Sequence, residues 1–535
     1  MQFRVMDWTR REFLRNSGLL LGGLAAGQGN AHRTGIIARP QLNLAAVERF
    51  VDPLPIPSLA KPAGRRPNPE DLKTSLPYYR IALRQLDYKV HRDLMPTRMW
   101  AYGGSFPGPT LETRSGEGML VEWVNDLPTT HFLPIDYTVH GADKNKPQVR
   151  IVTHLHGGKV PPHSDGYPED WYVPGKSATY FYPNQQDAAA LWYHDHALGI
   201  TRLNVYAGLA GNYFVRDAFE DGLNLPKGKY EIPLMIVDRS FDSQHQLYYP
   251  VSPDPESPWI PDLFCDALLI NGKLFPYLDV EPRKYRFRLL NASNGRMMHL
   301  ELSNGQEFIQ IGTDLGLLEA PVTLKRLTVA PAERMDLILD FSGHAGEKIV
   351  LQGDALTAMQ FRVAKTGMVD TSSLPKSLRT VERIPESASV QNRILTLGEK
   401  DDRAGNPMTM LLNNAHWGMP VTETPKLDSV EVWSLLNFTD DTHPIHLHLV
   451  RFQILDRQPF EAEDYYKTGK IRHIGGVVKP AANEMGWKDT AQAFPGMVTR
   501  IITKFSGYPG RFVWHCHLLE HEDNEMMRPY DVVKP

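Results

Sequence analysis

The sequence Trp-His-Cys-His-Leu-Leu-Glu-His, residues 514–521, is the most informative segment of this 535-residue chain. In an extended strand, successive side chains point to opposite faces, whereas residues two apart share a face. Cys516 therefore faces away from His515 and His517. The segment predicts a β-strand that presents a sulfur to one metal centre and two imidazoles to another, with only a few covalent bonds between them.

Four His-x-His pairs occur along the chain. With 20 histidines in 535 residues, chance alone predicts fewer than one such pair. Eight imidazoles exceed what a single ion can bind, so the pattern predicts a cluster of metal ions, and imidazole suits copper, zinc, iron and nickel. The pairs are His154/His156, His194/His196, His446/His448 and His515/His517.

A second ligand set lies on the other face of the same strands. His443 precedes His446 by an odd number of residues and therefore faces away from the paired imidazoles. Cys516, two imidazoles and a weak thioether form the ligand set of a blue copper electron-transfer site. The predicted ligands are Cys516, His443, His521 and Met526. Met527 is the competing thioether, and a closed zinc site is the competing metal centre.

Three similar segments indicate an internal repeat. They are residues 117–125, 281–291 and 429–437, and each ends on asparagine. Their separation is the length of a domain, so they predict an all-β chain of three β-sandwich domains. The expected boundaries are 76–222, 223–390 and 391–535, preceded by a proline-rich arm over 32–75. The alternation of apolar and charged residues over 285–289 predicts a strand with one buried face.

The repeat also indicates which domains bind metal. Residues Asp195, Ile200 and Val205 of the first domain occupy the positions of Cys516, His521 and Met526 of the third. The first domain therefore offers cluster ligands but no blue copper site. The second domain has His299 in place of a His-x-His pair and is expected to bind no copper. The cluster is accordingly expected between the first and third domains.

The N-terminal segment predicts export. A paired arginine at 10–11 precedes a short apolar run, as in a twin-arginine signal peptide, here assigned to residues 1–31. An amphipathic helix is the alternative. The expected location is periplasmic or secreted, with no membrane span in the mature chain. The formal net charge of −4 argues against nucleic-acid binding.

Together these motifs resemble the multicopper oxidase family, closest to the bacterial spore-coat laccase and bilirubin oxidase branch. The resemblance covers roughly residues 75–535 and includes Leu-Asn-Ala-Ser-Asn (290–294), Ala-Pro-Ala-Glu-Arg (330–334), Gly-Trp-Lys-Asp-Thr (486–490) and His-Glu-Asp-Asn-Glu-Met-Met (521–527). It implies three cupredoxin-like Greek-key domains and four copper ions: one type 1, one type 2 and two type 3. It implies His154 and His446 as type 2 ligands. The implied type 3 ligands are His156, His194, His196, His448, His515 and His517.

The implied activity is one-electron oxidation of four small reductant molecules, with dioxygen reduced to two waters, by a monomer. Electrons would enter at His521, and Asp165 and Glu522 would relay protons. Asp165 could instead hold a turn, and Glu522 could be an ion-pair partner. No disulfide is expected, because Cys265 has only the ligand Cys516 as a partner. The methionines at 408, 410 and 419 are interpreted as core residues, so phenols, aromatic amines or tetrapyrroles are favoured as substrates.

Three other functions remain open from the sequence. A metallo-oxidase would act on Cu(I), Fe(II) or Mn(II) with the same copper ligands. A storage or electron-shuttle protein needs no oxygen chemistry, and the eight paired histidines argue against it. A nitrite reductase of the two-domain type is a weaker alternative, since it lacks the full set of paired imidazoles.

Overall fold

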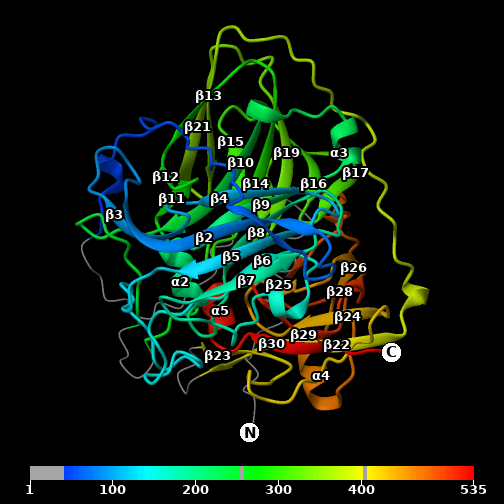
Figure 1. The fold of residues 1–535 in the computed structure, drawn as a ribbon. Coiled ribbons are helices and arrows are strands. Elements are labelled where there is room, and N and C mark those ends of the chain that lie inside the picture. Colours follow the sequence, from blue (N-terminus) through cyan, green and yellow to red (C-terminus); the bar gives the residue numbers. More distant parts are fainter. Residues whose placement is uncertain (1–40, 253–257, 402–406) are drawn as a thin grey trace.

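The computed structural model describes residues 41–252, 258–401 and 407–535 (Figure 1). The predicted signal peptide lies outside these residues. The described chain is built mainly from strands, which confirms the all-β prediction. Its helices are short: α2 (Thr201–Ala207), α3 (Ala218–Gly222), α4 (Ala462–Thr468), α5 (Leu519–Asp523), and the 3-10 turns η2 (Leu44–Ala46), η3 (Pro162–Ser164), η4 (Gly228–Tyr230), η5 (Glu386–Ala388) and η6 (Ala482–Glu484).

The first sandwich pairs two sheets around a core that includes Trp123 and Tyr193. One sheet has the order β1 (Gly64–Pro67), β2 (Ser75–Tyr88), β5 (Met119–Asn125), β7 (Ser177–Tyr182), with β3 (Thr97–Tyr102) also on β2. The other has the order β4 (Gly108–Arg114), β9 (Ala210–Arg216), β8 (Ala189–Asp195), β6 (Thr153–His156).

The second sandwich is at the top of Figure 1 and encloses a separate apolar core. Its larger sheet has the order β12 (Lys273–Leu274), β11 (Ala267–Ile270), β10 (Glu231–Arg239), β14 (Lys284–Asn291), β19 (Arg334–Asp340), β16 (Phe308–Thr313), β17 (Gly316–Leu324). Its smaller sheet has the order β13 (Tyr277–Val280), β21 (Leu356–Val363), β20 (Lys348–Gly353), β15 (Met298–Leu302), β18 (Leu327–Val329).

The third sandwich lies beside the first, with β25 near β6 in the centre of Figure 1. One sheet has the order β23 (Pro407–Leu412), β22 (Gln391–Asp401), β24 (Val430–Asn437), β28 (Met497–Lys504), β26 (Phe452–Pro459). The other has the order β27 (Thr490–Ala493), β25 (His443–Leu447), β29 (Gly510–Cys516), β30 (Met527–Val532). Both sheets contribute to one core, which contains Trp433 and Trp514.

The three repeated segments form equivalent strands, β5, β14 and β24. Each pairs in parallel with the first long strand of its sandwich and antiparallel with a later one. Each ends on a fully buried asparagine whose side chain accepts a hydrogen bond from the backbone N–H two residues on. This local turn explains why the asparagine recurs at Asn125, Asn291 and Asn437.

The expectation of one buried face on residues 285–289 is wrong. Arg286 and Arg288 are 2% and 3% exposed, so both faces of β14 are covered. The two guanidinium groups share Glu220 Oε1, at 2.9 Å from each, and Arg286 also pairs with Asp336. Buried charges are tolerated here because oppositely charged partners surround them.

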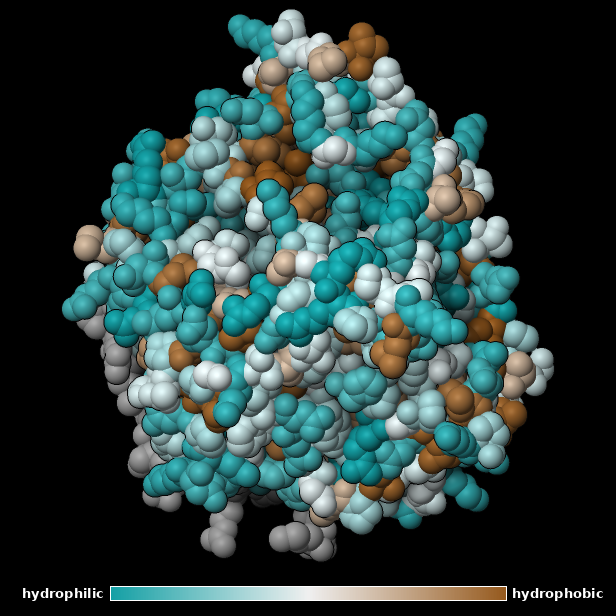
Figure 2. Space-filling model, in the orientation of Figure 1, coloured by the Kyte–Doolittle hydropathy of each residue, from teal (hydrophilic) through white to brown (hydrophobic). Residues whose placement is uncertain are grey.

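The proline-rich segment runs along the first two sandwiches. Isolated bridges join Pro53 to Tyr277 and Leu59 to Thr110, and β1 pairs with β2. Figure 2 shows a largely hydrophilic face with hydrophobic residues scattered over it. No helix in the described part of the chain is long and apolar enough to cross a membrane.

Candidate metal centres

Two pairs of neighbouring strands bring the eight paired histidines together. In the first sandwich, β6 and β8 are antiparallel and place His154 opposite His194. In the third, β25 and β29 are antiparallel and place His446 opposite His515. Because residues two apart share a strand face, each pair directs two imidazoles to the space between the sandwiches. All eight imidazoles are at most 1% exposed.

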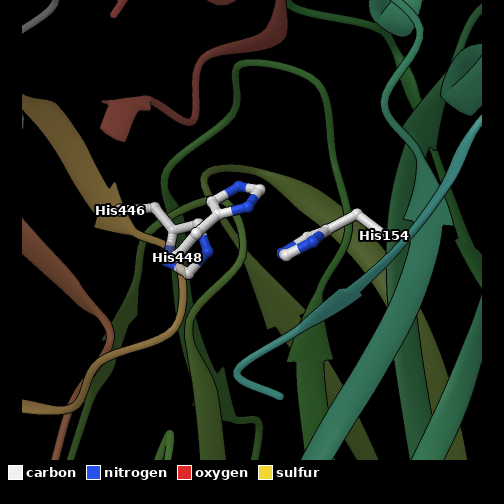
Figure 3. Close-up of side chains that lie close together, drawn as sticks. All are labelled: His154, His446 and His448. Atoms are coloured by element: carbon white, nitrogen blue, oxygen red, sulfur yellow. The ribbon is translucent and has the colours of Figure 1, made fainter. Parts of the chain in front are cut away.

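The imidazoles divide into groups whose ring nitrogens lie within 4.8 Å of one another. Two groups are triads that combine both sandwiches: His196, His448, His515, and His156, His194, His517. A third contains His154, His446 and His448, which project toward one another from opposite sides in Figure 3. His154 and His448 are nearly parallel, with ring centroids 3.7 Å apart.

Hydrogen bonds fix the orientation of these rings. The Nδ1–H groups of His154, His194 and His446 donate to the backbone carbonyls of Asp165, Asp195 and Asp489 at 2.6, 2.8 and 2.7 Å. Among the described residues, the Nε2 atoms of these three rings have no hydrogen-bond partner. Burial lowers the pKa of His194 to about 3, so its imidazole is neutral, the form that binds metals.

Asp165 directly follows η3 and contacts this centre. Its Oδ2 is 2.7 Å from His448 Nδ1 and its Oδ1 is 3.5 Å from His154 Nδ1. The carboxylate thus contacts one histidine from each sandwich, and it is 1% exposed. Burial raises the pKa of Asp165 well above its usual range.

Glu522, like Asp165, lies close to one histidine of the first sandwich and one of the third. It lies on α5, with Oε2 3.1 Å from His515 Nδ1 and Oε1 3.6 Å from His196 Nδ1. The neighbouring Asp523 accepts from the backbone N–H groups of Thr201 and Arg202 at the start of α2. These contacts tie α5 of the third sandwich to the first.

A third carboxylate at the centre is Asp489, for which the sequence predicts no role. Its Oδ1 is 3.1 Å from His156 Nε2 and 3.8 Å from His446 Nδ1. Arg334 donates from Nη1 to Asp489 Oδ1 at 2.8 Å and from Nη2 to Oδ2. The sequence signal was available, because both residues fall in the quoted motifs at 330–334 and 486–490.

The sulfur site lies on the opposite face of β25 and β29. His443 Nδ1 is 3.5 Å from Cys516 Sγ and 3.3 Å from His521 Nδ1, and all three residues are 0% exposed. Met526 is buried in the same core as Cys516, whereas Met527 packs in a different cluster with Trp417 and Val513. This packing favours Met526 over Met527 as the thioether of the site.

The edge of His521 is covered. Trp259 Nε1 donates to the Glu520 carbonyl at 2.9 Å, which holds the segment around residue 260 against α5. Burial lowers the pKa of His521 to about 3, and the Pro261 carbonyl opposes this shift. The sequence did not predict this cover, because the Trp259 contact joins residues 261 positions apart.

The positions expected to lack a blue copper site have other contacts. Asp195 accepts from the backbone N–H of Val152 and of Ala197 and from Asn204 Nδ2. Ile200 and Val205 are buried. In the second sandwich His299 Nδ1 is 3.2 Å from Thr328 Oγ1. Both cysteines are free, and Cys265 Sγ lies 3.6 Å from the Tyr206 hydroxyl.

Comparison with known proteins identifies the class. Models of the multicopper oxidase family match residues 87–219 and 385–535. The chain is 47% identical over 517 residues to a laccase of Bacillus subtilis (strain 168), covering 91% of this chain and 99% of that one. It is 36% identical over 576 residues to multicopper oxidase LPR1 homolog 1 of Oryza sativa subsp. japonica, covering 96% and 98%. The chain therefore belongs to the multicopper oxidase family.

A solved structure agrees with this membership. A laccase from Pediococcus acidilactici Pa5930 superposes with a TM-score of 0.74 at 27% identity, covering 92% of this chain and 96% of that one. The protein is thus a copper-dependent oxidoreductase with oxygen as acceptor, of cupredoxin-like fold. The buried imidazole nitrogens without partners and the thiol–imidazole group fit copper, because these donors are the ones copper prefers.

Proposed function

We propose that the protein oxidises phenols, aromatic amines or tetrapyrroles by one electron each and couples four such oxidations to the reduction of dioxygen to two waters. The observation that carries the proposal is the position of Cys516 between His515 and His517. Cys516 contacts His443 on one face of β29, while His515 contacts His196 and His448 on the other. Electrons taken at the sulfur site thus have a covalent path of a few bonds to the imidazole cluster.

The groups of ligand atoms support an assignment of four coppers. We assign type 1 copper to His443, Cys516, His521 and Met526, and type 2 copper to His154 and His446. The type 3 pair is assigned to the two triads, His196/His448/His515 and His156/His194/His517. When bound, copper would supply the electron-transfer and oxygen-reducing chemistry. Metal analysis that finds only one or two coppers in fully loaded, active protein would contradict the assignment.

The chain itself has to deliver protons to the reduced oxygen. We propose this role for Asp165 and Glu522, because each contacts one histidine of the first sandwich and one of the third. In Asp165→Asn, reduction of the blue centre by substrate under anaerobic conditions should keep its parental rate, while reoxidation by oxygen should slow about 100-fold. Asp170→Asn, at an exposed position, is the control. Equal reoxidation rates in parent and Asp165→Asn would contradict the role.

The substrate class is supported by the laccase relatives and by the site of electron entry. His521 is the type 1 ligand assigned to electron entry, and the segment with Trp259 and Pro261 covers it. We propose that an organic reductant approaches over this segment. The test is an oxygen-uptake screen of copper-loaded protein with a phenol, an aromatic amine, bilirubin, Fe(II), Cu(I) and Mn(II). The proposal expects the largest kcat/KM for an organic reductant.

A second candidate is a metallo-oxidase, and one observation favours it. Five carboxylates have negative charges that act on one another: Asp262, Glu399, Asp401, Asp440 and Asp441. The charge of Asp441 also acts on Cys516 of the sulfur site. Burial raises the pKa of Glu399 to about 8, and the other carboxylates of the group add to this. Carboxylate oxygens suit Mn(II) and other hard cations. If Glu399→Gln lowers kcat/KM for Fe(II) or Mn(II) but not for a phenol, the metallo-oxidase is favoured.

We further propose export through the twin-arginine route and a monomeric state. Export is supported by Arg10 and Arg11 before the apolar run. The monomer is supported by the fact that one chain supplies every assigned ligand. A double Arg→Lys variant at 10 and 11 that still reaches the periplasm would contradict the route. Light scattering that gives twice the chain mass would contradict the monomer.

A further inference from the structure

A cavity of about 360 Å³ lies where the three sandwiches meet, and its lining includes Gly157 and Leu449, which follow His156 and His448 in the chain. The first sandwich contributes the turn after β6 and residues 185–187, the second contributes Leu315, and the third contributes residues that follow His448 and β28. Among the described residues, no histidine lines it. Clefts between domains are common sites for small molecules.

The charged groups that line this cavity are mainly positive. They are Lys159, Arg451 and Lys504, against the single carboxylate of Asp187. Asp187 is already shared by two guanidinium groups, with Arg451 at 2.7 Å and Arg379 at 3.0 Å. Lys504 has a separate carboxylate, Asp428, at 3.8 Å, so Lys159 is the cation of the three without an ion-pair partner among the described residues.

Among the three cations, Lys159 is half-buried, whereas Arg451 and Lys504 are exposed. Within the described residues no carboxylate lies within 4.0 Å of its Nζ. Burial lowers the pKa of Lys159, and the charges of Arg451 and Lys504 lower it further, while Asp428 opposes them. The ammonium thus faces an excess of positive charge without a partner of opposite sign.

The loop that carries Lys159 is held in place. Gln186 Oε1 accepts from the Lys159 backbone N–H at 2.9 Å, and Gln186 Nε2 donates to the Gly157 carbonyl at 3.0 Å. The Lys159 stem passes close to Gly507, where an added Cβ would lie 2.8 Å from Lys159 Cε. A fixed loop loses little conformational entropy when a ligand binds.

We propose that this cavity binds a small oxyanion with at least two negative charges. Lys159 and Arg451 would contact the anion, with Lys504 at the rim, because ammonium and guanidinium groups recognise phosphate and carboxylate oxygens. Inorganic phosphate and an organic polycarboxylate share this chemistry, and the volume admits either. The inference does not depend on the proposed substrate class.

The site is linked to the cluster through the chain. Gly157 follows His156 directly, and an added Cβ at Gly157 would lie 2.7 Å from Asp489 Oδ2 and 3.0 Å from Arg334 Nη2. Because residues of all three sandwiches line the cavity, it forms when the three sandwiches are in this arrangement. A bound anion should therefore raise the midpoint of thermal unfolding, because it binds the folded chain and not the unfolded one.

The test is calorimetric titration of the copper-loaded, full-length protein with inorganic phosphate and, separately, with citrate. Ionic strength is held constant with sodium chloride, since exposed charges are screened by salt. The expected result is saturable binding of one anion per chain, weakened about tenfold or more by Lys159→Gln and retained by Lys159→Arg. Tighter binding of phosphate would identify an inorganic oxyanion site, and tighter binding of citrate a polycarboxylate site.

The control is Lys348→Gln, at an exposed position on β20, which should bind as the parent does. Spectra of the copper centres separate the cavity from direct binding of the anion to copper. Absence of saturable binding would overturn the proposal. So would binding that is unchanged in both Lys159→Gln and Arg451→Gln, or binding that perturbs the copper spectra equally in the parent and in Lys159→Gln.

Discussion

Arg334 of the second sandwich and Asp489 of the third form a doubly hydrogen-bonded ion pair in which both side chains are at most 1% exposed. Arg334 Nε also donates to the Ala190 carbonyl of the first sandwich at 3.0 Å. The same Asp489 carboxylate lies 3.1 Å from His156 Nε2. One guanidinium group therefore joins all three sandwiches at the edge of the imidazole cluster.

Arg334→Leu should lower the free energy of unfolding by about 3–5 kcal/mol, because it leaves the buried Asp489 carboxylate without its cation. It should also reduce the copper content, since Asp489 contacts His156. Chemical denaturation and metal analysis measure the two effects. Arg326→Leu, which removes a partly exposed pair with Asp354, is the control and should cost about 1 kcal/mol or less. Equal losses in the two variants would contradict the prediction.

Cys516→Ser should abolish the blue absorption band while the far-ultraviolet circular dichroism stays that of the parent. The thiolate is the assigned ligand responsible for the colour, and serine differs from cysteine by one atom in a buried position. Oxygen uptake with any reductant should be lost as well. Visible absorption and circular dichroism test the prediction, and retained colour would show that the thiolate assignment is wrong.

Asn437→Ala should lower the free energy of unfolding by about 1–3 kcal/mol. The asparagine side chain donates hydrogen bonds to the Asp441 and Ala493 carbonyls and accepts one from Thr439 N–H. Asn437 lies six residues before His443, so the absorption of the blue centre should also change.

The equivalent Asn291→Ala removes bonds to Arg296, Val329 and Ser293 in the sandwich without assigned copper ligands. This variant should lower the free energy of unfolding by a similar amount and leave the absorption of the blue centre unchanged. A spectral change in Asn291→Ala alone would contradict this pair of predictions.

The free energy of unfolding should decrease as the pH falls below about 5, because Glu231, which pairs with the buried arginines of β14, becomes protonated. Burial raises the pKa of Glu231, but Arg288, Arg286 and Arg216 outweigh this and hold the pKa at about 2. A carboxyl whose folded pKa is depressed stabilises the protein above its unfolded pKa and loses that contribution as pH falls toward the folded value. The contribution is about 3 kcal/mol at neutral pH. Urea denaturation across this range should show a shallower slope for Glu231→Gln, and a parental slope would contradict the prediction.

Removal of copper should lower the stability of the third and first sandwiches together. A ligand that binds only the folded state contributes about 4 kcal/mol at a free concentration about 1,000 times its Kd. The buried imidazole nitrogens without partners should make the metal-free chain less stable than the copper-loaded one. Thermal unfolding of chelated and reloaded protein measures the difference. Identical midpoints would contradict the prediction.

The repeat and the histidine groups could be predicted from sequence because both depend on local periodicity. Two-residue spacing fixes the face of a strand, so the opposite orientations of Cys516 and His515 were predictable. The packing of Met526 with Cys516 supports a choice that the sequence left open between Met526 and Met527. The division of six histidines into two triads needed the fold, because each triad combines residues from two sandwiches.

What the sequence did not reveal depends on contacts between distant residues. Arg286 and Arg288 alternate with apolar residues as surface residues do, and their burial is explained by three carboxylates: Glu220, Glu231 and Asp336. Arg334 and Asp489 lie 155 positions apart, and no periodicity relates them. The cover over His521 likewise comes from Trp259, which lies 261 positions before its partner Glu520 in the chain. The motifs at 330–334 and 486–490 mark Arg334 and Asp489 individually, but the sequence does not show that the two side chains meet.

The second sandwich provides none of the assigned copper ligands, yet its Arg334 donates hydrogen bonds to Ala190 of the first sandwich and Asp489 of the third. A derivative from which this sandwich was excised would keep every imidazole and the thiol but would lose the cation beside Asp489. Its two remaining halves would have to find their alignment without that anchor. The second sandwich thus supplies no assigned copper ligand, but it holds the first and third sandwiches in the relative position that the shared copper ligands require.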